Sequence, residues 1–172
     1  MSEQHPEGLA EKLTDAYNRM LERTREAMDK ADKGLREGVD TAMEKATELG
    51  ELTREEAELV SIYVMRDLED AAEFISEEGQ ELAGWLKFDL ELVERSLLDI
   101  FAQMVDHTRE ELTKLELRAN ALGEWKSGEV TGIGTLQCKS CGELLHFHKT
   151  GHIPPCPKCH GTTYRRISSR DE

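Results

Sequence analysis

The chain has 172 residues, of which 34% are charged and only 5% aromatic, and its formal net charge is −14. This length allows one domain of moderate core, or a helical part with a small appendage, and the composition favours long solvated helices over a compact enzyme. No run of eighteen apolar residues is present, which argues against a membrane span. Residues 1–125 carry a net charge of −17 and residues 126–172 carry +3, which argues against nonspecific nucleic-acid binding by the whole molecule.

Residues 8–49 are predicted to form one long helix. No proline interrupts residues 9–49, and apolar or small residues recur there at regular intervals, in eleven steps over 40 residues. Each step is therefore close to one turn of an α-helix, so these residues form a stripe along one face. A stripe with this period needs little supercoiling, so we expect a nearly straight helix about 60 Å long. Gly34 and Gly38 weaken this helix locally.

Two further helices are predicted, over residues 53–78 and 80–122. Gly50 suits the end of the first helix, and Thr53-Arg-Glu-Glu56 has the form of a capping box for the second. Gly79 is expected to break or bend the chain between the second and third helices. Short connections make successive helices antiparallel neighbours. Residues 1–124 are therefore predicted to form one helical region, which is acidic. Association between copies through these helices is left open.

After the helices, the composition changes to β-type residues and glycines, beginning at Trp125. This change predicts a zinc ribbon over residues 125–167, followed by a disordered tail over residues 168–172. The fold class is therefore mainly α: a long antiparallel helical hairpin or three-helix bundle with a small C-terminal β zinc ribbon.

The four cysteines of the chain all lie in the predicted ribbon, and they are Cys138, Cys141, Cys156 and Cys159. Two C-x-x-C pairs separated by fourteen residues fit a tetrahedral, all-cysteine zinc site. Each pair can form a tight turn, called a knuckle below, and Gly142 can adopt a positive φ just after the first one. We therefore expect one structural Zn²⁺, bound by the four thiolates.

Other uses of these cysteines fit the sequence less well. A disulfide framework suits a secreted chain, but residues 1–7 show neither a basic n-region nor an apolar h-region. A redox C-x-x-C motif belongs at a strand-to-helix junction in a βαβ pattern, where neither pair lies. A catalytic zinc keeps one ligand position open, whereas four thiolates close the site. A metal role for His146, His148, His152 or His160 is left open.

The cysteines belong to a longer pattern: Ser127-Gly-Glu-Val130, Gly132-x-Gly134-x-Leu136-x-Cys138-x-x-Cys141 and Pro155-Cys-Pro-x-Cys159. Together with Gly50-Glu-Leu-Thr53 and Arg66-Asp-Leu-Glu69, this pattern resembles the uncharacterised, YbeL-like family of bacterial zinc-ribbon-containing proteins. The resemblance covers residues 45 to 167. It implies a helical fold with a terminal metal-binding ribbon, and no established activity. His160 departs from the glycine that this family tends to carry there, but histidine tolerates the left-handed conformation better than most residues.

The expected function is that of a nonenzymatic, cytoplasmic zinc-binding protein that acts as a protein-interaction or adaptor module toward an unidentified protein partner. No nucleophile–base pair or phosphate-binding loop is evident in the sequence. The alternative is a nucleic-acid- or transcription-associated regulator, in which basic and aromatic ribbon residues contact phosphates and bases. The residues concerned are Lys149, Lys158, Tyr164, Arg165 and Arg166.

The sequence also predicts that the two regions are independent. Because metal stabilises the ribbon whereas apolar burial stabilises the helices, chelation is expected to unfold residues 130–167 and to leave residues 9–122 intact.

Overall fold

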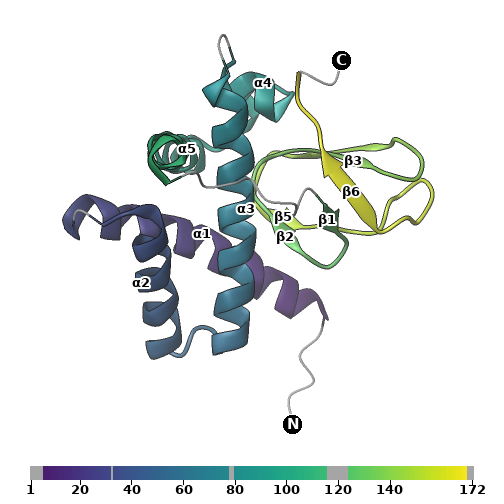
Figure 1. Cartoon of the computed structure of the whole chain (residues 1–172). Coiled ribbons are helices and arrows are strands. Elements are labelled where there is room, and N and C mark those ends of the chain that lie inside the picture. The colour runs from purple at the N-terminus through teal and green to yellow at the C-terminus, as the bar shows by residue number, and fades with distance from the viewer. Residues whose placement is uncertain (1–5, 32, 78–79, 116–123, 170–172) are drawn as a thin grey trace.

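A computed structural model describes residues 6–31, 33–77, 80–115 and 124–169 of the chain (Figure 1). The helices are α1 (Pro6–Ala31), α2 (Leu35–Glu48), α3 (Arg54–Ser76), α4 (Leu82–Leu86), the 3-10 helix η1 (Leu90–Leu92) and α5 (Arg95–Leu115). The strands are β1 (Trp125–Lys126), β2 (Val130–Thr131), β3 (Gly134–Cys138), β4 (Leu144–Phe147), β5 (Gly151–His152) and β6 (Thr163–Arg166). The predicted fold class, mainly α with a small C-terminal β zinc ribbon, is confirmed.

Helix α3 runs through the middle of the molecule, with α2 and α5 on one side and the strands on the other (Figure 1). None of the described helices is long and apolar enough to cross a lipid bilayer.

The single straight helix expected over residues 8–49 is wrong. The chain leaves the helix after Ala31 and starts α2 from Gly34, whose backbone is extended (φ −69°, ψ 169°). Helices α1 and α2 pack closely at Gly38. A side chain there would lie 3.0 Å from Met28 Cγ and 3.2 Å from the backbone oxygen of Thr24. The apolar stripe is therefore buried by folding the chain back on itself.

The turn into α3 follows the sequence prediction closely. Gly50 adopts a positive φ of 70° after α2. The backbone N–H of Glu56 donates to the Thr53 hydroxyl (3.1 Å), and the backbone N–H of Thr53 donates to the Glu56 carboxylate (2.9 Å). The predicted capping box is therefore confirmed, and it fixes the start of the central helix.

The third helix expected over residues 80–122 is also wrong, because this segment forms α4, η1 and α5. Lys87 ends α4 in the left-handed conformation (φ 61°), and the Asp89 carboxylate accepts from the backbone N–H of Glu91 (3.0 Å). Trp85 donates to Asp70 of α3 (2.7 Å), which holds α4 against that helix. Gly79 and residues 116–122 lie outside the described residues; α3 itself ends at Ser76.

The ribbon contains two antiparallel sheets. The larger has strand order β1-β6-β3-β4, and the smaller pairs β2 with β5. The ribbon has a small core of its own, which consists of Trp125, Leu136, Cys138, Ile153, Cys156 and Tyr164. Val130 and Ile133, however, are buried in the core of the helices. Apolar packing therefore crosses the domain boundary predicted at residue 124.

The disordered tail predicted over residues 168–172 begins too early. Ser168 is buried, as is Ile167 before it. The final residues, 170–172, lie outside the described part of the chain.

Candidate metal centre

The two cysteine pairs form matching knuckles. In the first, the backbone N–H of Gly142 donates to the Cys138 carbonyl oxygen at 2.9 Å, and in the second the N–H of His160 donates to the Cys156 carbonyl oxygen at the same distance. The donors in both turns have a positive φ, 82° at Gly142 and 62° at His160. The expected positive φ at Gly142 is confirmed, and His160 takes the left-handed conformation that its position requires.

The chain that follows the second knuckle passes directly over the sulfur atoms. A side chain at Gly161 would lie 3.2 Å from the Sγ atoms of both Cys138 and Cys159. The carbonyl oxygen of Gly161 also accepts from the backbone N–H of Cys156 (2.8 Å), and its N–H lies 3.4 Å from Cys159 Sγ. A side chain at Gly161 would push the sulfur atoms aside by a few tenths of an ångström, so Gly161 shapes the site although it supplies no ligand.

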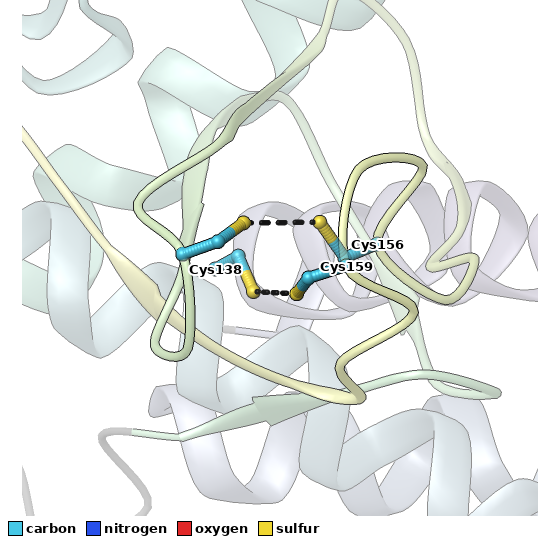
Figure 2. Close-up of side chains that lie close together, drawn as sticks. Cys138, Cys156 and Cys159 are labelled. Carbon is cyan, nitrogen blue, oxygen red and sulfur yellow. Dashed lines mark hydrogen bonds between the residues drawn. The ribbon is translucent and has the colours of Figure 1, made fainter.

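The four thiols converge on one point. Their Sγ atoms all lie within 4.8 Å of one another, with Cys138 and Cys159 separated by 3.5 Å and Cys141 and Cys156 by 3.6 Å. Figure 2 shows the thiols of the two knuckles facing each other. A tetrahedral zinc ion with Zn–S bonds of about 2.3 Å sets its sulfurs about 3.8 Å apart. The cluster fits zinc, whereas a disulfide needs an S–S distance of about 2.0 Å.

The electrostatics of the cluster also favour a cation. The backbone N–H of Cys141 makes the largest contribution in lowering the pKa of Cys138 to about 6. At Cys159, the backbone N–H of Gly161 lowers the pKa, but the neighbouring thiols of Cys141 and Cys138 raise it, and the net result is a pKa of about 12. One thiolate is therefore stabilised by the fold and further thiolates are opposed by their neighbours. A divalent cation would relieve that repulsion.

The histidines are engaged elsewhere or exposed. His146 Nδ1 lies 3.0 Å from the Thr135 hydroxyl, and the His148 ring packs against Phe88 with a centroid distance of 4.6 Å. His152 and His160 are exposed. Among the described residues, the one group of three or more side chains able to hold a metal consists of the four cysteines and includes no histidine.

The chain is similar to known proteins over most of its length. The family model described as the zinc-ribbon containing domain matches residues 22–168. The chain belongs to the zinc-ribbon containing domain family. Relatives from Escherichia coli strain K12 and Escherichia coli O157:H7 are both named Uncharacterized protein YbeL. They are 29% identical in an alignment of 163 residues that covers 90% of this chain and 96% of theirs. No solved structure matches the chain.

In this member of the zinc-ribbon containing domain family, a fully buried carboxylate lies between the ribbon and the helices. The Asp67 side chain of α3 is 0% exposed. It accepts hydrogen bonds from Tyr17 (2.6 Å), Trp125 (3.0 Å), Thr131 (3.1 Å), the backbone N–H of Gly132 (2.7 Å) and Arg166 (3.1 Å). Arg66 Nε lies 3.5 Å away. Burial raises the pKa of Asp67, but the charges of Arg66 and Arg166 and the hydrogen bonds from Gly132 and Tyr17 together lower it, and the net pKa lies below the ordinary value.

Two arginines complete this network. The guanidinium carbon atoms of Arg66 and Arg166 lie 4.9 and 5.0 Å from the Trp125 ring centroid. Arg66 also donates to Glu129 (2.6 Å) and to the Val130 carbonyl oxygen (3.2 Å). Sequence reasoning assigned no role to Asp67. The signal that could have found it is the Arg-Asp pair within a largely apolar helix face.

The family-like Gly132-x-Gly134 pattern is explained by the same network. A side chain at Gly132 would lie 2.6 Å from the Tyr17 hydroxyl oxygen, and one at Gly134 would overlap the Arg166 guanidinium group. These glycines therefore admit Tyr17 and Arg166 to the space around Asp67.

Proposed function

We propose that this chain is a nonenzymatic zinc-binding protein that acts as a protein-interaction or adaptor module, with one structural Zn²⁺ bound by Cys138, Cys141, Cys156 and Cys159. The observation that carries this proposal is the convergence of four thiols from two facing knuckles. Four thiolates complete the coordination of a tetrahedral ion and leave no position for a substrate or an activated water. Zinc bound there would supply a crosslink between the knuckles.

The position of the knuckles supports an interaction role. Their tips are exposed at Lys139, Ser140, Pro157 and Lys158, whereas other parts of the ribbon are fixed to the helices through Asp67. A short segment that is rigidly held and solvent-facing suits docking, because little conformational freedom is lost on binding. We place the protein in the cytoplasm, where thiols stay reduced and available to a metal.

The structure weighs against the nucleic-acid alternative. Tyr164 is fully buried, and Arg166 is enclosed by Trp85 and Trp125. Arg165 remains on the surface, but its guanidinium donates twice to the Gln137 side-chain oxygen, at 2.9 and 2.7 Å. Two of the five residues that could have contacted nucleic acid therefore have buried side chains, with 3% exposure at Arg166. The acidic body also repels phosphates.

A binding measurement separates the two functions. We expect no appreciable binding of DNA or RNA at about 150 mM salt, where the Debye length is about 8 Å, by the wild type or by a Lys158→Ala, Arg165→Ala double variant. Arg166 is left in place because its replacement would disturb the buried network. Tight binding by the wild type that is lost in the double variant would overturn the adaptor proposal and favour the regulator.

Affinity capture of the intact, zinc-loaded protein from lysate, with and without nuclease, gives the complementary result. An adaptor retains its protein partner after nuclease treatment, whereas a partner that is lost with nuclease would indicate a nucleic-acid bridge. Capture of a second copy of the same chain would show self-association.

A further inference from the structure

The helices depend on the ribbon to compensate a buried charge. Of the groups that contact the Asp67 carboxylate, two belong to the helices, Tyr17 and Arg66. The other contacts come from the C-terminal region and are made by Trp125, Thr131, Gly132 and Arg166. A carboxylate that is fully buried is strongly destabilising unless charge partners and hydrogen-bond donors surround it.

The strands that carry Trp125 and Arg166, β1 and β6, belong to the same sheet as β3, which ends at Cys138. Cys138, at the end of β3, pairs with Tyr164 of β6, and Arg166 lies two residues further along β6 opposite Leu136. Trp125 of β1 pairs with the same Tyr164. The ribbon core is small, so loss of a metal crosslink between the knuckles would release these strands. Trp125 and Arg166 would then leave Asp67.

We propose that the metal centre controls the packing of the helices through Asp67, so that metal loss opens the face of α1 and α3 that the ribbon covers. Departure of the ribbon would let water reach the Asp67 carboxylate and the neighbouring Tyr17 hydroxyl, and hydration of this pair would loosen the packing of α1 against α3. Val130 and Ile133, which are buried among the helices, would leave the core in the same step. This metal-dependent opening rests on the zinc binding proposed above but not on the adaptor role, and it replaces the sequence-based expectation that chelation leaves the helices intact.

Hydrogen exchange on the full chain tests the proposal. After zinc removal by a chelator, amides of α3 around Asp67 and of α1 around Tyr17 should exchange at least about tenfold faster than in the zinc-loaded protein, together with those of the ribbon. A Cys156→Ser, Cys159→Ser variant provides metal loss without a chelator and should give the same pattern. Lys149→Ala, which removes an exposed charge of the ribbon outside both knuckles, should match the zinc-loaded wild type.

Asp67→Asn tests whether the coupling runs through this carboxylate. In the zinc-loaded protein the neutral side chain removes the negative charge that Arg66 and Arg166 share and leaves Arg66 paired with Glu129, so α3 should exchange faster than in the wild type. In the metal-free protein the neutral side chain is less costly to bury than the charged one, so α3 should exchange more slowly than in metal-free wild type. The proposal fails if zinc removal leaves α1 and α3 protected in the wild type, or if Asp67→Asn changes α3 in the same direction in both states.

Discussion

Replacing Asp67 with alanine is expected to lower the free energy of unfolding of the zinc-loaded protein by about 3–5 kcal/mol, the usual cost of removing one partner from a buried ion pair. The variant leaves the guanidinium groups of Arg66 and Arg166 without their shared carboxylate. It also removes the acceptor of the buried donors Trp125 Nε1 and the Gly132 N–H. This loss is a large share of the stability of an ordinary domain.

The measurement is the denaturant midpoint of both proteins at neutral pH with zinc in slight excess. Glu58→Ala is the matched control, because Glu58 is a carboxylate of the same helix that pairs on the surface with Arg54 at 3.3 Å. This exposed pair should contribute no more than about 0.5 kcal/mol. Equal shifts for the two variants would contradict the account of Asp67 as the link between ribbon and helices.

Gly134→Ala is expected to destabilise the protein by at least about 2 kcal/mol more than Gly128→Ala, because its new methyl group pushes the buried Arg166 guanidinium away from the Asp67 carboxylate. Both glycines have a positive φ, 143° at Gly134 and 95° at Gly128. Alanine at either position therefore strains the backbone by about 1–3 kcal/mol. A side chain at Gly134 would also displace the Arg166 guanidinium, whereas one at Gly128 would have nothing within 4 Å.

Thermal unfolding of the two zinc-loaded variants provides the comparison. The additional loss at Gly134 should disappear when Arg166 is also replaced by alanine, because the methyl group then has no guanidinium to displace. Similar melting temperatures for Gly134→Ala and Gly128→Ala would show that the close approach of Arg166 is unimportant.

The features that the sequence could predict are local ones. The spacing of Cys138, Cys141, Cys156 and Cys159 defines two knuckles over a few residues each, and the structure brings all four thiols together. The capping box at Thr53 spans a single turn, so its residues meet in any helix that starts there. Such patterns need no knowledge of the rest of the fold.

The helix lengths were wrong for a physical reason. An apolar stripe is compatible equally with one straight helix and with two helices folded against each other, and only tertiary packing decides between them. Gly34 and Gly38 carried the necessary signal. Gly34 is the N-cap residue of α2, and Gly38 allows α1 to approach α2 closely. Similarly, Trp85 of α4 stacks on Phe101 of α5 at a centroid distance of 5.4 Å. This tertiary contact packs α4 against α5 as a separate helix.

The Asp67 network lay beyond sequence reasoning because its members are distant along the chain. Tyr17 and Arg166 lie 50 and 99 residues from Asp67. No spacing rule connects them, and Arg166 reads as a surface cation next to Arg165. The burial of Arg166 removes it from the nucleic-acid surface on which the regulator alternative depended.

The most direct test of the central claim is metal analysis of the protein, purified without added reductant or chelator, together with its intact mass. The account predicts one zinc per wild-type chain, four thiols without disulfides, and loss of the zinc in Cys138→Ser. Absence of zinc in the wild type, together with the mass decrease of two disulfides, would contradict it.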